Sequence, residues 1–104
     1  MTGPTANARA SLEAVVRGRV QGVGFRYFVL DLATELGLVG WVANEWGGSV
    51  HCVVEGPRAD LETLLVALQR GPRGARVDEV QTTWGPPRGS FDGFTVRAGG
   101  HPGD

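Results

Sequence analysis

The chain has 104 residues, a formal net charge of −1 and one cysteine, Cys52. Its length fits one domain with a modest hydrophobic core, and its charge gives no general attraction to nucleic acid or to an anionic membrane. One cysteine excludes an internal disulfide and a CxxC site. His51 and His101 lack the spacing of metal ligands, so we expect neither a metal nor a cofactor.

The N-terminal stretch MTGPTANAR lacks the apolar region of a secretory signal. No apolar run in the sequence is long enough to cross a membrane. These features predict a cytoplasmic protein. Residues 1–10 are small and polar and are predicted to form a disordered tail. Residues 98–104 are predicted to form a flexible tail, so the domain should span residues 11–97.

The first predicted element is a strand over residues 12–19. Its residues alternate, with Leu12, Ala14 and Val16 on one face and Glu13 and Arg17 on the other. After a glycine-rich stretch, residues 25–37 are predicted to form a helix that ends at Gly37. Apolar residues recur there at helical spacing: Phe25, Phe28, Val29, Leu32 and Leu36.

Two strands, residues 38–44 and 49–56, are predicted to form a hairpin across a glycine turn. A second helix should follow over residues 56–71, with Pro57 at its start and an apolar stripe. That stripe consists of Leu61, Leu64, Leu65 and Leu68. Strands over residues 76–84 and 94–97 complete the chain. The order βαββαβ plus one strand predicts an α+β, ferredoxin-like sandwich, in which two helices cover one face of an antiparallel sheet.

The stretch GRVQGVGFR, residues 18–26, is predicted to bind an anion. The start of a helix leaves N–H groups outside the helical ladder and carries partial positive charge. A loop with Gly18, Gly22 and Gly24 lets further amides converge on an anion. Arg26 adds a planar fork that matches two phosphate oxygens. The alternative is a purely structural turn, and the stretch lacks the Walker and dinucleotide-binding patterns.

The segments GRVQGVGFR, LGLVGWVANEWGGSV and VVEGP closely resemble the acylphosphatase family. The resemblance covers residues 12–97. It implies metal-independent hydrolysis of the carboxyl–phosphate bond of small acyl phosphates, giving a carboxylate and orthophosphate. It also implies that Arg26 and Asn44 are catalytic. The phosphate would be bound by the loop Gln21, Gly22, Val23, Gly24, Phe25 and Arg26. The only expected partners are this substrate and its product, with no nucleic acid or membrane, and we expect a monomer.

The chemistry of an acyl phosphate agrees with these roles. Its leaving group is good, so catalysis needs mainly positioning and charge stabilisation. Arg26 and the loop amides would hold the phosphoryl oxygens, and Asn44 would orient the attacking water. Three positions depart from the family pattern: Ala43, Glu45 and Gly47. A carboxylate at Glu45 would repel an anionic substrate if it faced the site.

Other interpretations stay open for these residues. Arg26 could pair with an acidic residue on the helix surface, and Asn44 could merely start the hairpin turn. Trp41 is expected in the core, and Trp46 either covers the acyl group or packs on the hairpin. His51 is expected to be a solvated strand residue, and Cys52 a buried apolar filler.

Two other functions remain to be weighed. One is a non-catalytic phosphate-binding or regulatory module with the same fold. The other is a binder of single-stranded RNA, which would need aromatic residues on the two central strands. The segments 12–19 and 49–56 contain none, so RNA binding is disfavoured.

Overall fold

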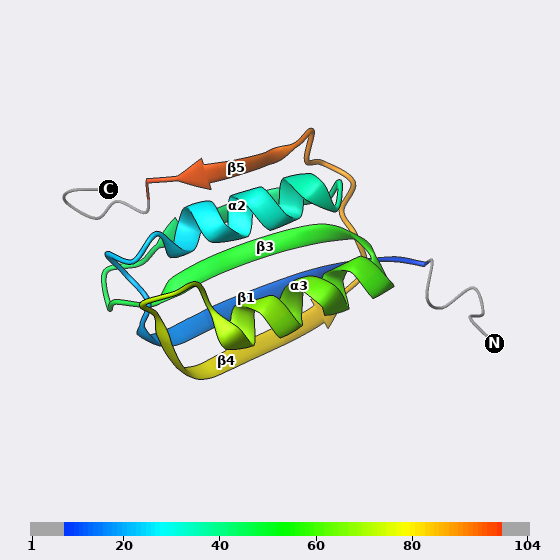
Figure 1. Ribbon diagram of the computed structural model, residues 1–104. Helices are drawn as coiled ribbons and strands as arrows, with labels where there is room; N and C mark the ends of the chain where they lie inside the picture. The colour runs from blue at the N-terminus through cyan, green and yellow to red at the C-terminus, as the bar shows by residue number, and fades with distance from the viewer. Residues whose placement is uncertain (1–7, 99–104) are drawn as a thin grey trace.

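The computed structural model describes residues 8–98, which form five strands and two helices. One sheet has the strand order β4-β1-β3-β2-β5, and both helices lie on the same face of it (Figure 1). This arrangement is the predicted ferredoxin-like sandwich with an extra C-terminal strand. The elements are β1 (Arg9–Arg19), α2 (Phe25–Glu35), β2 (Val39–Asn44), β3 (Val50–Pro57), α3 (Arg58–Arg70), β4 (Arg76–Gly85) and β5 (Phe94–Arg97).

The ends of the domain differ slightly from the predicted limits. Strand β1 begins at Arg9, so Arg9 and Ala10 belong to the sheet and not to a tail over residues 1–10. Both pair with β3, opposite Pro57 and Gly56. The other parts of the two predicted tails, residues 1–7 and 99–104, lie outside the described residues.

The fifth strand runs parallel to its neighbour, whereas the other pairings are antiparallel. Gly40 of β2 lies opposite Phe94 of β5, and Ala43 lies opposite Arg97. The direction follows from the path of the chain. Strand β4 ends at one edge of the sheet, and the loop of residues 86–93 crosses to the other edge at the same end (Figure 1). From there the chain runs beside β2 in the same direction, so the pairing is parallel.

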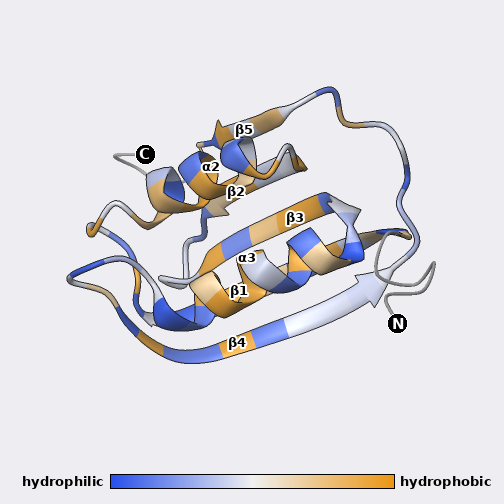
Figure 2. Cartoon of the chain, turned by 45° about the vertical axis from the view of Figure 1, so that its right-hand side comes forward, coloured by the Kyte–Doolittle hydropathy of each residue, from blue (hydrophilic) through white to orange (hydrophobic). Residues whose placement is uncertain are grey.

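The hydrophobic core lies between the sheet and the helices. As predicted from the alternation in β1, Leu12, Ala14 and Val16 have 0% exposure. Hydrophobic residues of β1 and β3 lie beneath α3 (Figure 2). Residues from both helices complete this layer: Phe25, Val29, Ala33, Leu61, Leu64 and Leu68. Cys52 is also fully buried here, and this burial raises the pKa of its thiol to about 12. The thiol stays protonated and acts as the apolar filler that we expected.

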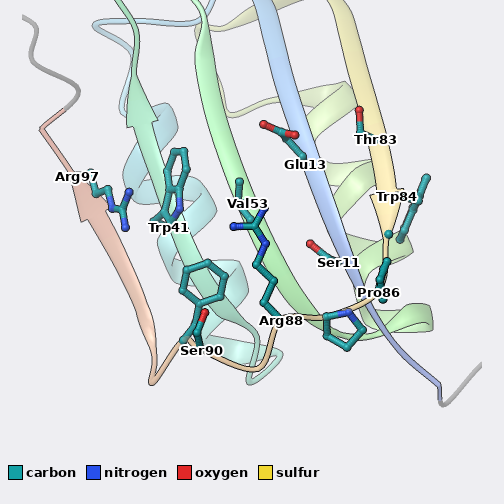
Figure 3. A pocket seen from close by; sticks show the side chains of 13 residues that line it. Ser11, Glu13, Trp41, Val53, Thr83, Trp84, Pro86, Arg88, Ser90 and Arg97 are labelled. Carbon is teal, nitrogen blue, oxygen red and sulfur yellow. The ribbon is translucent and has the colours of Figure 1, made fainter.

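The prediction that Trp41 belongs to the core is wrong. Its neighbour Val42 has 0% exposure under the helices, so alternation along β2 directs Trp41 to the open face of the sheet. There the Arg97 guanidinium lies 4.6 Å from the indole centroid, and the His51 ring lies 4.9 Å away. Figure 3 shows Trp41 beside Arg97 on this face.

The loop of residues 86–93 is held to the sheet by a buried carboxylate. Glu55 is only 1% exposed and accepts hydrogen bonds from the N–H groups of Arg88 and Gly89, at 2.9 and 3.1 Å. A hollow of about 730 Å³ lies on the open face beside this loop (Figure 3). Glu55 therefore fixes the connection that carries the chain to β5.

We expect Gly40→Ala to destabilise the fold, because Gly40 has φ 138° and a Cβ there would collide with the carbonyl oxygen of Val53. The loss in free energy of unfolding should be about 2–4 kcal/mol, measured by urea denaturation. Gly47→Ala is the matched control, since its Cβ would meet nothing within 4 Å. It should change the stability by no more than about 0.5 kcal/mol. Equal stability of the two variants would contradict the steric argument.

Candidate functional site

A small cavity lies where helix α2 begins and strand β2 ends. Its volume is about 170 Å³. It is lined by Val20, Gly22, Gly24, Phe25, Arg26, Tyr27 and Asn44. The cavity thus joins most of the glycine-rich stretch to Asn44, which lies 18 positions beyond Arg26 in the sequence.

The loop that enters the helix has the backbone geometry expected of an anion-binding turn. Gly22 and Gly24 both have φ 76°, in the left-handed region that only glycine adopts readily. Gly24 is the N-cap of α2, and no side chain caps the helix. The helical ladder starts where the N–H of Phe28 donates to the Gly24 carbonyl at 3.0 Å. The first turn contains no acidic residue. No carboxylate there competes with a bound anion for the N–H groups at the positive end of the helix.

Gly18 has a different role from the one predicted. It does not line the cavity. It sits at an irregularity in the pairing of β1 with β4, with φ 133°, and a Cβ there would collide with the carbonyl oxygen of Arg76. Gly18 therefore allows two strands to approach closely, while Gly22 and Gly24 shape the loop itself.

The strand register brings Asn44 to the glycine loop. Val50 of β3 lies opposite Val16 of β1 on one side and opposite Asn44 of β2 on the other. The loop that leaves β1 after Arg19 is therefore at the same end of the sheet as Asn44. Asn44 is buried, with 7% exposure, and alternation places it on the helix side with Val42.

Sequence reasoning missed the role of the Gln21 side chain. Its Nε2 donates to the carbonyl oxygens of Glu45 and Ser49, at 2.7 and 3.0 Å. Both carbonyls belong to the turn between β2 and β3, so Gln21 ties the glycine loop to the turn that follows Asn44. The partners lie 24 and 28 residues away, and no local pattern could have indicated them.

Glu45 does not present the repulsive charge that its position suggested. Its Oε1 lies 2.8 Å from Nδ1 of His51. Nε2 of the same ring lies 2.7 Å from Oε2 of Glu13 on β1. The expectation that His51 is merely a solvated strand residue is therefore wrong, since its side chain is 21% exposed and contacts two carboxylates. The Glu45 carboxylate is directed to the open face.

Besides buried Phe25, one exposed aromatic residue lines the cavity. Tyr27, which sequence reasoning overlooked, lines it and is 60% exposed. Its place directly after Arg26 was the available signal. Trp46 is 65% exposed in the hairpin turn and is not among the lining residues.

The family model described as Acylphosphatase matches residues 12–96 of this chain. The chain belongs to the acylphosphatase family. It is 53% identical over 84 residues to an acylphosphatase from Moorella thermoacetica, covering 81% of this chain and 89% of that protein. An acylphosphatase from Salinibacter ruber is 48% identical over 86 residues, covering 83% and 90% of the two chains.

A solved structure supports the same grouping. The crystal structure of acylphosphatase from Bacillus subtilis aligns with a TM-score of 0.82 and 34% identity, covering 85% of this chain and 98% of that chain. Within residues 8–98, no helix is long and apolar enough to cross a membrane. The same residues contain no group of three or more His, Cys, Asp or Glu side chains placed to hold a metal ion.

Proposed function

We propose that this chain hydrolyses small acyl phosphates to a carboxylate and orthophosphate, and that the cavity at the start of α2 is the catalytic site. The observation that carries this proposal is the meeting of Arg26 and Asn44 in one cavity at a helix N-terminus without a side-chain cap. Membership of the acylphosphatase family supports the reaction type. The roles of individual residues follow from their chemistry.

The glycine loop would hold the phosphoryl group. Left-handed Gly22 and Gly24 let the backbone curl, so that N–H groups can surround the phosphoryl oxygens. The positive end of the α2 dipole favours the same charge. Arg26 would add a bidentate contact that grips the equatorial oxygens as charge redistributes in the transition state.

Asn44 would place the attacking water. Its amide can both accept from and donate to a water molecule, and its fixed position at the end of β2 would align the water with the bond to the leaving carboxylate. The water oxygen bonds to phosphorus, and the bond from phosphorus to the carboxyl oxygen breaks. An amide is a poor base, so the proton of the water would pass to an oxygen of the phosphoryl group.

The size of the cavity bears on the substrate class. At about 170 Å³ it is smaller than pockets that enclose a whole drug-sized ligand, which span roughly 300–1,000 Å³. We infer that it takes the phosphoryl group, while the acyl part lies outside, next to exposed Tyr27. This arrangement would recognise acyl phosphates by their shared group and tolerate different acyl groups.

The alternative of a non-catalytic phosphate-binding module would need the cradle and Arg26 but not Asn44. No observation favours it, and the Asn44 variant below separates the two. A cytoplasmic location and a monomeric state also belong to the proposal.

We expect the purified protein to hydrolyse an aromatic or short aliphatic acyl phosphate in the presence of a chelator. Ordinary phosphate monoesters should not react, because an alkoxide is a much poorer leaving group and no acid or metal in the proposed mechanism assists it. The measurement is release of orthophosphate from both substrates, with and without chelator. Equal rates on the two substrates, or loss of activity with chelator, would refute the mechanism.

We expect Arg26→Ala to lower kcat/KM by about 10³-fold or more, in line with other arginines that stabilise phosphoryl transfer. Arg26→Lys should recover little activity, because an ammonium group cannot make the bidentate contact. Steady-state kinetics of both variants test this, and Arg73→Ala, an exposed arginine outside the cavity, is the control. A lysine variant with most of the wild-type rate would exclude the bidentate role.

Asn44→Ala should lower kcat by about 10²-fold and leave orthophosphate binding nearly unchanged, if the side chain orients water. The measurements are single-turnover kinetics and the inhibition constant of orthophosphate. Weak phosphate binding with a preserved kcat would assign Asn44 to the phosphate cradle. Unchanged kinetics would leave it only a structural role in the turn.

A further inference from the structure

Three titratable residues form a hydrogen-bonded chain on the open face of the sheet. His51 lies on the central strand β3, Glu13 on β1 and Glu45 in the turn directly after β2. The two ring nitrogens of His51 lie 2.7 Å from the Glu13 carboxylate and 2.8 Å from the Glu45 carboxylate. Figure 3 shows Glu13 and Trp41 on this face, on the strands that flank β3. The hydrogen-bonded chain therefore links β1, β3 and the turn that follows β2.

This geometry determines which atoms donate. An ionised carboxylate can only accept hydrogen bonds, whereas a neutral imidazole has one donor and one acceptor. Both ring nitrogens of His51 face carboxylate oxygens at hydrogen-bond distance. Both contacts are satisfied together when both nitrogens carry a proton.

This hydrogen-bonded chain of side chains ends at Glu45, the residue that follows Asn44. The main chain of Glu45 is held as well: its N–H donates to the Ser49 carbonyl at 2.9 Å, and its own carbonyl accepts from Gly48 at 3.1 Å. That carbonyl also accepts from Gln21 at 2.7 Å. Glu45 thus connects the hairpin turn, the glycine loop and, through His51, strand β1.

We propose that His51 is a positioning residue for the reaction. By contacting Glu13 and Glu45 through its two ring nitrogens it anchors Glu45 to β1. It thereby fixes the end of β2 from the open face, while the Asn44 side chain lies on the other face. This rests on the proposed function, because it concerns the placement of Asn44 relative to the phosphate cradle. A displacement of about 1 Å can lower a catalytic rate by about 10²-fold, so the anchor controls kcat.

The His51 ring is surrounded by charged and aromatic groups. Glu13 and Glu45 contact it directly. Trp41 contacts the ring edge to face, and the Arg97 guanidinium lies over the indole.

The test compares kcat and KM for a simple acyl phosphate in variants of the chain. His51→Gln can donate to only one carboxylate, and we expect its kcat to fall roughly tenfold or more with a smaller change in KM. Glu45→Ala should behave in the same way. Glu45→Gln keeps an acceptor oxygen and should recover part of the loss. The isosteric Glu45→Gln variant limits disturbance of the fold, and the stability of every variant is checked by urea denaturation.

A matched control comes from the same face of the sheet. Glu79 of β4 lies opposite Arg17 of β1, and the two side chains form an ion pair at 3.8 Å. Glu79→Gln removes the same charge as Glu13→Gln but no contact with His51. We expect Glu13→Gln to lower kcat and Glu79→Gln to leave it near the wild-type value. Equal effects would indicate a general charge effect and overturn the proposal.

The split between kcat and KM separates positioning from simple structural support. Loss of positioning should lower kcat with little change in KM, because phosphate binding by the glycine loop and Arg26 stays intact. A kcat of His51→Gln within about twofold of wild type, or a loss confined to KM, would overturn the inference.

The outcomes also separate this inference from the proposed function. A wild-type protein without activity on acyl phosphates would overturn both. An active wild type whose His51 and Glu45 variants keep the full kcat would overturn the positioning role alone.

Discussion

The pairing of β3 with both β1 and β2 is the constraint on which the candidate site depends. Val50 lies opposite both Val16 and Asn44. The last residues of β1 and of β2 must therefore lie at the same end of the sheet. A shift of one residue in the pairing of β2 with β3 would turn Asn44 to the open face. The core enforces this register, because the same shift would expose Val42, which is fully buried.

The two faces of the sheet have different roles. The helix side carries the core and the cavity, while polar side chains on the open side form hydrogen bonds that hold the ends of strands and loops in place. Glu55 accepts from the loop before β5, and His51 joins Glu45 to β1. Buried or half-buried charges of this kind are costly unless their hydrogen bonds are made. Within residues 8–98, no buried side-chain nitrogen or oxygen lacks a hydrogen-bond partner.

Much of the fold was predictable because local patterns carry it. The alternation in β1 identified Leu12, Ala14 and Val16 as core residues, and the spacing of leucines placed α3 within a residue or two of its observed bounds. The glycine-rich stretch likewise indicated a loop whose backbone can curl around an anion. For the site, the family pattern singled out Arg26 and Asn44, and the structure places both in one cavity. Their catalytic roles stay predictions.

The errors share a cause. Trp41 lies between apolar neighbours in VGWVAN, so its own hydrophobicity could not show which face it takes. The contacts of Gln21 and His51 depend on partners up to 38 residues away. The role of Gly18 became clear only when the carbonyl of Arg76 was placed beside it. These features follow from the assembled sheet and not from any segment alone.

The start of α2, which has no side chain at its N-cap, makes the stability of the native state depend on the anions in solution. Gly24 offers no side chain to the first turn, and no acidic residue is there to complement the dipole. Under the proposed function, a phosphoryl group would act as a temporary cap for this helix. The free energy of unfolding would then increase with the concentration of phosphate, by mass action. In each turnover the start of α2 would be capped while phosphate is bound and uncapped after its release. The protein would therefore resist unfolding more strongly with phosphate bound than without it.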